Sequence, residues 1–255
     1  MQYALPTDDA TLSASTITAS AEDPDYAAEN LGTENPAKPA KLTTPTGSFV
    51  ITLPSSQTIV GCILLYHNLD AALGSVTIAN GGGFSQAITI PAARADGWTT
   101  SASTTFSSTH ATWTLTFGAA NSQNIKIGRV MLLTALRTFT KDIRWTSSFS
   151  ESEGYGLIEQ ATELGVETIY QLEGPRRTLE AEMGALDAQS VILQNLRRVC
   201  GGRQRPFLMI PAHANGTDPW IVRWVEPVGR RSYLVPTYSS FEFRVQECSR
   251  GLDWP

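Results

Sequence analysis

The chain has 255 residues, of which 42% are hydrophobic and 17% charged, and its formal net charge is −5. This length is enough for one large or two ordinary domains. A net negative charge argues against a general nucleic-acid binder, because neutralising phosphates requires a basic surface. No apolar run approaches the roughly 18 to 20 residues of a membrane span, and we expect no signal peptide in the first residues.

The composition changes near residue 137. Residues 1–136 contain 5 Lys or Arg and 9 Asp or Glu, whereas residues 137–255 contain 14 and 15. The first half is rich in Ser, Thr, Ala and Gly, and nearly all basic residues of the second half are Arg. We therefore expect two domains of different architecture, 1–136 and 137–255.

The first half shows the period of two that is typical of strands. In "ATWTLTF", Trp113, Leu115 and Phe117 fall on one face and threonines on the other. The three glycines at 81–83 predict a hairpin turn. Residues 19–46 lack such alternation and are expected to form an ordered loop pinned by Tyr26 and Leu31. The pattern predicts a β-sandwich or jelly roll with strands at 48–54, 59–69, 74–80, 86–91, 111–117 and 124–136.

The second half combines strands with one helix. The stretch 137–152 predicts a long strand or hairpin, and the residues flanking Pro175 predict a pair of strands. A helix is expected from Asp187, a good N-cap, to the breaker Gly201-Gly202. Further strands are predicted at 205–212, 220–227 and 232–249. The fold class is therefore mainly β: an N-terminal β-sandwich followed by an α+β sandwich with one packed helix.

Cys62, Cys200 and Cys248 lie far apart in the sequence and form no CxxC motif. We expect buried, reduced thiols, as suits a protein made in a cytoplasm. The histidines His67, His110 and His213 fit no spacing of metal ligands. Glu22–Asp25 could offer oxygen ligands to calcium, but a solvated acidic turn is favoured because the dense calcium-loop pattern is absent. No metal and no cofactor is expected.

Three residues are weak candidates for ligand binding. His67 and Asn68 end the apolar run "IVGCILLYHNL" and could form a base with its orienting amide. No nucleophile or carboxylate partner is recognisable, so a polar cap on a buried strand is favoured over catalysis. Trp98, in the polar turn "ADGWTTS", could stack on a sugar, pack against a partner or be buried. No catalytic residue is assigned.

Arginines recur in pairs in the second half. Because acidic residues are interspersed with them, we favour a subunit interface over nucleic-acid binding. The candidate interface residues are Arg176, Arg177, Arg203, Arg205, Arg230 and Arg231.

Two stretches of the first half, "AENLGTENPAKPAKLTT" and "GSFVITLPSSQTIVGCILLYHNL", resemble the galactose-binding-like jelly roll of discoidin-type modules. The second half is similar to the tail-tube and distal-tail fold of long-tailed bacteriophages. The stretches that carry this likeness are "FTKDIRWTSSFSESEGYG", "LQNLRRVCGGRQRPFLMIP", "WIVRWVEP" and "YSSFEFRVQECSRG". That resemblance implies a homo-oligomeric ring, a hexamer, that joins the tail tube to the hub and tip proteins.

The order of the two domains is the reverse of that in typical distal tail proteins, which leaves open which ring of the tail tip or baseplate this is. The leading hypothesis is a structural, non-enzymatic protein of the virion, made in the host cytoplasm. One alternative is a carbohydrate-binding module for host attachment. The other is an envelope-degrading glycosidase using Glu151 and Glu153, which we consider the least favoured because such a pair on a strand usually shares a solvated face.

Overall fold

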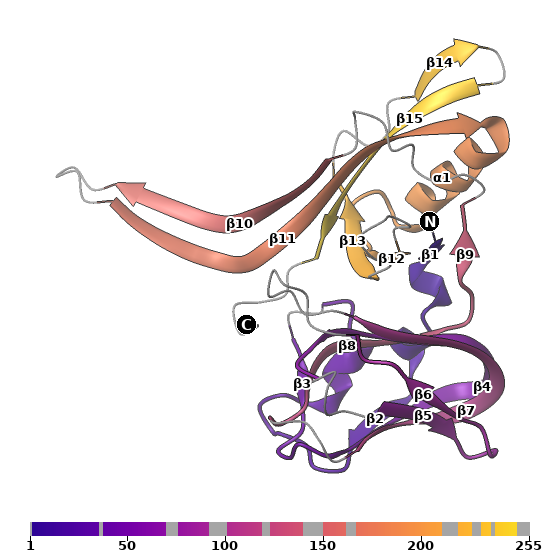
Figure 1. The fold of residues 1–255 in the computed structure, drawn as a ribbon, viewed down its shortest axis with the longest axis vertical. Helices are drawn as coiled ribbons and strands as arrows, with labels where there is room; N and C mark the ends of the chain where they lie inside the picture. Colours follow the sequence, from indigo (N-terminus) through magenta and orange to yellow (C-terminus); the bar gives the residue numbers. More distant parts are fainter. Residues whose placement is uncertain are drawn as a thin grey trace. The chain divides into compact units, whose positions relative to one another are not determined.

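The structure is a computed structural model (Figure 1) that describes residues 2–35, 38–69, 76–91, 101–118, 123–139, 150–161, 167–210, 219–225, 231–235 and 238–248. The protein is mainly β, with antiparallel sheets and one α-helix in these ranges, which confirms the predicted fold class. The chain divides into two compact units. The first unit comprises residues 1–138 and 207–220, and the second comprises residues 139–206 and 221–255.

The first unit is built around one sheet with the strand order β3-β8-β4-β7-β5-β6, to which β2 is added at β4. A smaller antiparallel ladder joins β1 to β9 and β12. The strands are β1 (Gln2–Ala4), β2 (Thr16–Ala19), β3 (Ala40–Lys41), β4 (Gly47–His67), β5 (Val76–Asn80), β6 (Ser85–Ile88), β7 (Ala102–Phe117), β8 (Lys126–Leu133), β9 (Arg137–Thr138) and β12 (Phe207–Ile210). Three short 3-10 helices precede β4: η1 (Pro6–Asp8), η2 (Ala10–Ser13) and η3 (Ala28–Gly32).

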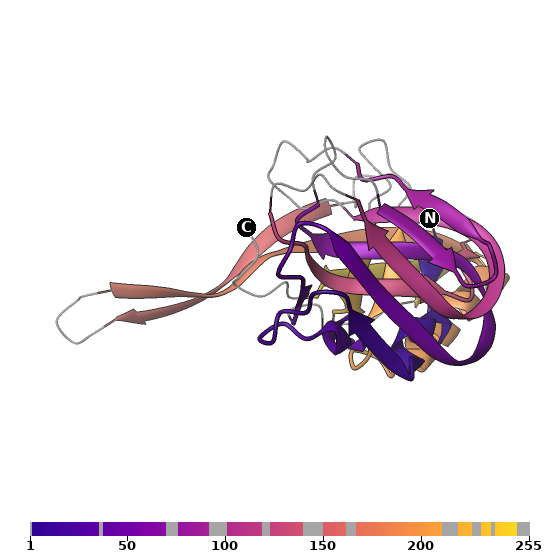
Figure 2. The same ribbon diagram turned by 90° about the horizontal axis from the view of Figure 1, so that it is seen from below.

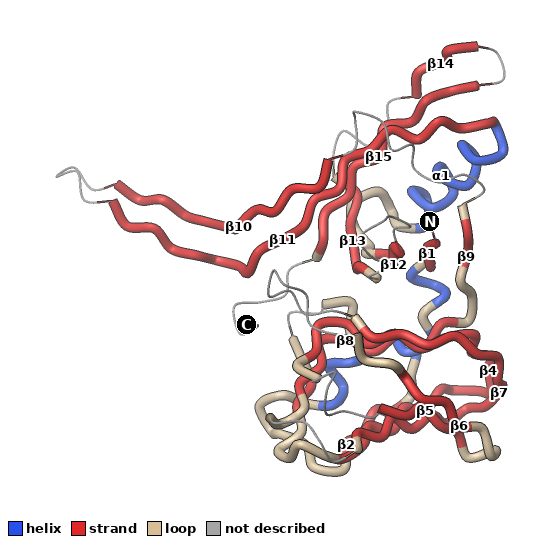
Figure 3. The backbone as a smooth tube through the Cα atoms, in the orientation of Figure 1, coloured by secondary structure: helices blue, strands red, loops and turns tan. Residues whose placement is uncertain are grey.

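The sheet folds over on itself because its two longest strands pass through both layers (Figure 3). The start of β4 pairs with β2 and with the end of β7, whereas its later part pairs with β8 and with the start of β7. The β4–β7 register shifts between Thr52 and Gln57, where the long strands bend. The sequence predicted two separate strands here, and the structure shows one. This continuity explains how a single hydrogen-bonded sheet forms a sandwich.

The core lies between the two layers. Trp113, Leu115 and Phe117 are each at most 2% exposed, which confirms the predicted buried face of β7. The Phe117 ring packs edge to face against Phe49 of β4, with ring centroids 5.9 Å apart. The turn at residues 81–83 joins β5 and β6 as predicted.

The later part of β4 and most of β8 are buried on both faces. Cys62 and Leu64 face the core, while their neighbours Ile63 and Leu65 are equally buried outside it. A strand covered on both faces reads as a continuous apolar run, which accounts for "CILLY" and "VMLL" in the sequence. The outer face of these strands is therefore a second packing surface.

The second unit contains β10 (Ser150–Ala161), β11 (Glu167–Leu186), α1 (Asp187–Val199), β13 (Trp220–Trp224), β14 (Arg231–Val235) and β15 (Tyr238–Glu247). Its sheet has the order β10-β11-β15, and both β13 and β14 pair with β15. The predicted pair of strands flanking Pro175 was wrong. Strand β11 runs through Pro175, and its hairpin partner is β10. Within the predicted segment 137–152, residues 140–149 lie outside the described residues.

The helix α1 confirms the predicted helix. Leu193 and Leu196 on its inner face are buried, and Arg197 and Arg198 occupy its last turn. Gly201 and Gly202 then adopt left-handed φ angles of 58° and 67°, which glycine reaches without strain. All three cysteines are free and buried, as the sequence predicted.

Candidate functional site

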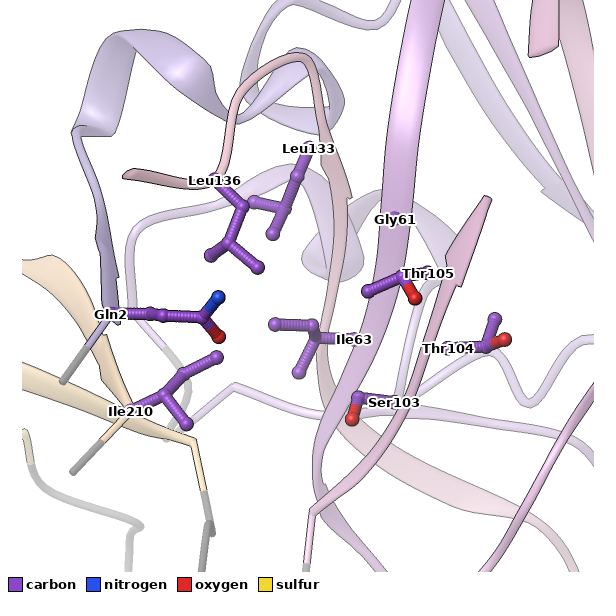
Figure 4. A pocket seen from close by; sticks show the side chains of 9 residues that line it. All are labelled: Gln2, Gly61, Ile63, Ser103, Thr104, Thr105, Leu133, Leu136 and Ile210. Atoms are coloured by element: carbon purple, nitrogen blue, oxygen red, sulfur yellow. The ribbon is translucent and has the colours of Figure 1, made fainter. Parts of the chain in front are cut away.

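The first unit contains a cavity of about 250 Å³ (Figure 4). It lies on the outer face of the layer formed by β8, the later part of β4 and the start of β7. Strands β4, β7 and β8 form one wall, and β1 and β12 contribute to the other. Figure 4 shows the side chains of Gln2, Ile63 and Ile210 approaching the same space from both walls. The residues that line the cavity are Gln2, Gly61, Ile63, Ser103, Thr104, Thr105, Leu133, Leu136 and Ile210.

Gly61 lines the cavity at a place where β4 comes close to the backbone of β7. It pairs with Thr105 next to a register irregularity that begins at Ile59, so the wall is not a regular ladder here. A Cβ added at Gly61 would lie 3.1 Å from the carbonyl oxygen of Thr104, which is tighter than an ordinary contact. Glycine within a strand often marks a place where a ligand or another backbone comes close. The position therefore favours glycine for reasons of space.

The lining combines neutral polar groups with an apolar floor. Ser103 and Thr105 are exposed on the same face of β7, because side chains alternate along a strand. The Gln2 amide adds both donors and an acceptor, while leucine and isoleucine side chains supply the apolar surface. None of the lining residues is ionisable. Such a cavity suits a small neutral ligand that carries hydroxyl groups.

Two neighbouring carboxylates hold the segment that follows β1, Asp9 to β8 and Asp8 to β9. Asp9 accepts a hydrogen bond from Arg129 Nη2 at 2.7 Å in a fully buried pair, and it caps η2 through the N–H of Thr11. Burial raises the pKa of Asp9, while Arg129 and the hydrogen bonds oppose that rise. Asp8 accepts two hydrogen bonds of 2.9 Å from the guanidinium of Arg137 and raises its pKa. These contacts fix the wall that carries Gln2.

The end of β4 is buried rather than exposed to water. Tyr66 has a φ of +54°, which is unusual for a residue with a side chain. His67 is 1% exposed, its Nδ1 accepts the N–H of Leu69 at 3.3 Å, and Nε2 has no hydrogen-bond partner among the residues that the structure describes. Burial lowers the pKa of His67 to about 4. The polar cap predicted for this strand end is therefore buried at His67 and does not reach water.

Asn68 ties β4 to the start of β8. Its Nδ2 donates to the carbonyl oxygen of Asn124 at 2.8 Å, and its Oδ1 accepts the N–H of Lys126 at 2.8 Å. These bonds give Asn68 a structural role. A ligand role for His67 and Asn68 stays a prediction, and neither residue lines the cavity.

The other predicted site residues are spread widely. Trp98 and Arg230 lie outside the described residues. Arg176, Arg177 and Arg231 lie in β11 and β14, whose side chains at these positions are not described. Arg203 is exposed and Arg205 half-buried in the turn after α1. Their interface role stays a prediction.

Acidic residues 22–25 form local contacts. Glu22 accepts the N–H of Ala28 at 2.6 Å, and Asp23 pairs with Lys41 at 3.1 Å. Across the described part of the chain, no three His, Cys, Asp or Glu side chains gather closely enough to hold a metal ion. No helix in that part is long and apolar enough to cross a membrane.

The hairpin of the second unit is a further candidate site (Figures 1 and 2). We define the arm as residues 156–161 of β10 and 167–173 of β11, which pair with each other. The third strand, β15, pairs with β11 only from Thr178 to Leu186. Within the described residues, the arm is therefore a two-stranded ribbon with no further strand on either edge.

Sequence reasoning missed both the cavity and the arm. The cavity combines Gln2, Gly61, the Ser103–Thr105 stretch and Ile210, which are distant in sequence, and the Ser/Thr-rich tract carries no motif. The arm was hidden because Pro175 suggested a turn between two strands. The missed signal was charge, since residues 150–175 contain glutamates but no Lys or Arg.

No known protein family matches the sequence, and no curated protein matches it either. Solved structures do match, at low similarity. A chitosan-binding module from a chitosanase/glucanase of Paenibacillus sp. IK-5 has a TM-score of 0.38 and 16% identity, and the match covers 49% of this chain and 98% of the module. The family 32 carbohydrate-binding module of NanJ from Clostridium perfringens, bound to galactose, has a TM-score of 0.39 and 11% identity. This match covers 51% of the present chain and 97% of the module.

A third match is the family 32 module of AlyQ in complex with 4,5-unsaturated mannuronic acid, with a TM-score of 0.37 and 16% identity. This match covers 53% of the present chain and 99% of the module. At such scores the likeness assigns neither fold nor ligand, so the sandwich rests on the strand pairing described above. What the fold and sites define is a two-unit, mainly β protein with a neutral cavity and an unpartnered arm.

Proposed function

We propose that this protein is a non-enzymatic component of an oligomeric assembly, in which the second unit joins the copies and the first unit binds neutral carbohydrate. In its specific form, the assembly is a ring, a hexamer, in the tail tip or baseplate of a long-tailed bacteriophage. Its partners are then the tail-tube and hub proteins, and its place is the virion. The bacteriophage setting comes from the sequence resemblance of the second half.

The assembly role is carried by one observation, the unpartnered arm. A two-stranded ribbon alone in water is at most marginally stable, because each strand leaves one row of backbone N–H and C=O groups unpaired. A third strand or a packed surface would satisfy those groups. Neighbouring copies of an assembly can provide one.

The oligomeric state tests this role. We expect the purified full chain to form a defined oligomer by light scattering and native mass spectrometry, and electron microscopy should show a ring with a central channel. A protein that stays monomeric at high concentration, and that binds neither tail-tube nor hub proteins, would contradict the proposal.

Carbohydrate binding is the second candidate function, and the cavity favours it. Its hydroxyl and amide groups offer donors and acceptors to sugar hydroxyls, and its apolar floor offers contact to the C–H face of a sugar ring. A volume of about 250 Å³ suits one ring rather than a chain of them. The solved modules that match are carbohydrate-binding proteins by name, but the cavity is the observation on which this function rests.

A matched pair of variants tests the cavity. Ser103→Trp would fill its mouth, whereas Ser107→Trp changes an exposed serine on the same strand that does not line it. We expect glycan-array binding by the wild type and by Ser107→Trp, and a loss of at least tenfold in Ser103→Trp. Equal binding by both variants would exclude this cavity as the sugar site, and no binding by any protein would exclude the function.

A further inference from the structure

Two stretches of the second unit each carry charges of one sign only. From Ser150 to Pro175 there are six glutamates and no Lys or Arg, and this stretch contains the arm. From Ala188 to Thr217 there are four arginines and no Asp or Glu, and this stretch contains most of α1 and the following turn. One acidic and one basic element thus belong to the same unit.

The outward face of α1 has the features of a contact surface. Val191 is 52% exposed and is the one large hydrophobic residue that is exposed among the described residues. Asn195 and Arg198 follow it at helical spacing and are also exposed, as is Arg203 in the turn beyond. We define the α1 patch as Val191, Gln194, Asn195, Arg198 and Arg203.

A structural role explains only part of this pattern. Arginines in the last turn of a helix stabilise it through the helix dipole, which accounts for Arg197 and Arg198. The dipole does not account for the exposed Val191, for Arg203 beyond the helix, or for the absence of any acid over residues 188–217. A docking partner that is acidic and partly apolar accounts for all three.

The arm has this chemistry. Its sequence supplies Glu159, Glu167 and Glu173 together with the apolar residues Leu157, Ile158, Ile169, Tyr170 and Leu172. The arm cannot reach the α1 patch of its own copy, because the two are at opposite ends of β11. The arm contains the start of β11, and α1 follows its end. Between Glu173 and Leu186 lies roughly 40 Å of extended strand at about 3.3 Å per residue. Figure 1 shows the arm and α1 at the two ends of β11.

We infer that the arm of one copy docks on the α1 patch of the next copy. The contact is heterologous, since different surfaces of the two copies meet, and such contacts repeat around a ring when the rotation closes. Opposite charges select the partner surface and orient it, while Val191 supplies apolar contact. This interface deepens the proposed assembly role and rests on it.

Charge reversal with compensation tests the interface in the full chain. The arm variant carries Glu159→Lys and Glu167→Lys, and the patch variant carries Arg198→Glu and Arg203→Glu. Each should assemble at least tenfold more weakly than the wild type, because like charges then face each other. The variant that carries all four changes should regain assembly.

Mixing gives a sharper result. A 1:1 mixture of the arm variant and the patch variant should assemble in alternation, because every arm then meets a patch of opposite charge. The matched control is Arg223→Glu, which reverses an exposed arginine of β13 and should leave assembly unchanged. Circular dichroism verifies that each variant is folded.

The outcomes separate the two proposals. If the wild type forms oligomers that neither reversal weakens, the arm–patch interface is wrong and the assembly role stands. If both reversals weaken assembly but neither the mixture nor the fourfold variant restores it, the two surfaces do not contact each other. If the wild type stays monomeric, the arm–patch interface is wrong, and if it also binds neither tail-tube nor hub proteins, the assembly role fails as well.

Discussion

The two units differ in how their long strands are paired and in where their charged residues lie. In the first unit, β4 and β7 fold one sheet into a sandwich, and charged groups such as Asp9 and Arg129 meet inside the unit at 2.7 Å. In the second unit, β10 extends beyond the third strand of its sheet, and the acidic and basic stretches are separated along the chain. The Asp9–Arg129 pair closes within the first unit, whereas the arm of the second unit has no third strand among the described residues.

This difference predicts where mutations will act. Changes to buried polar contacts of the first unit should reduce stability most, because no solvent replaces the lost partner there. Changes to the arm of the second unit should reduce assembly and leave stability nearly unchanged. Changes that break this division should affect unfolding in the order Arg129, His67, Asn68 and the arm, from the largest effect to the smallest.

Loss of Arg129 should reduce the free energy of unfolding more than any of the other changes. Arg129→Met leaves Asp9 buried without its counter-charge, and breaking a buried ion pair in this way costs about 3 to 5 kcal/mol. Urea unfolding followed by circular dichroism measures the loss. The matched control is Arg137→Met, whose side chain is 44% exposed and whose loss should cost about 1 kcal/mol or less. Equal losses for the two variants would contradict the distinction between the buried and the exposed pair.

His67 should make the first unit sensitive to acid. Its pKa is about 4 in the folded state, because burial disfavours the charged ring, against 6.5 ordinarily. Between these values the unfolded chain binds a proton and the folded chain does not. The contribution of neutral His67 to the free energy of unfolding is therefore fully present above pH 6.5. It falls by about 3 kcal/mol as the pH drops towards 4.

The variant His67→Gln isolates this effect from the titration of carboxylates. Its unfolding free energy should decline less than that of the wild type between pH 6.5 and 4, whatever its stability at neutral pH. Parallel declines for the two proteins, measured by urea unfolding at each pH, would show that His67 does not titrate in this way.

Asn68 should have a moderate effect. Asn68→Ala removes two hydrogen bonds to the backbone at Asn124 and Lys126, and each such bond contributes about 1 kcal/mol. We expect a loss of about 1 to 2 kcal/mol in urea unfolding. Asn68→Asp keeps the acceptor and loses the donor, so it should fall between the wild type and Asn68→Ala at neutral pH. A ligand role without a structural one would leave both variants as stable as the wild type.

The sequence predicted those parts of the fold that depend on local patterns. The alternation of Trp113, Leu115 and Phe117 identified a buried strand face, and Gly201-Gly202 marked the end of the helix. Pro175 misled, because β11 passes through it despite the missing N–H donor. A local signal cannot reveal that the strand continues, since continuation depends on pairing with β10 and β15.

The candidate sites were harder to predict for the same reason. His67 ends an apolar run and was predicted to cap a buried strand, but the burial of its own side chain is decided by segments distant in sequence. The cavity needs Gln2 and Ile210, which are 208 positions apart in the numbering and meet through the β1–β12 ladder. The arginine pairs were visible in the sequence, whereas the stretch 188–217, with four arginines and no acid, gained meaning only once the arm was seen.

Removing the arm should affect unfolding least and assembly most. Residues 155–175 can be replaced by Asn-Gly, which forms a tight two-residue turn between antiparallel strands. Gly154 pairs with Arg176 in the structure, so the shortened hairpin keeps the register of β10 and β11. An isolated ribbon contributes little stability, and we expect the unfolding free energy to change by less than about 1 kcal/mol. Light scattering should nevertheless show a monomer. A shortened chain that still assembles would place the contacts between copies elsewhere, whereas one that unfolds would show that the arm belongs to the unit's own core.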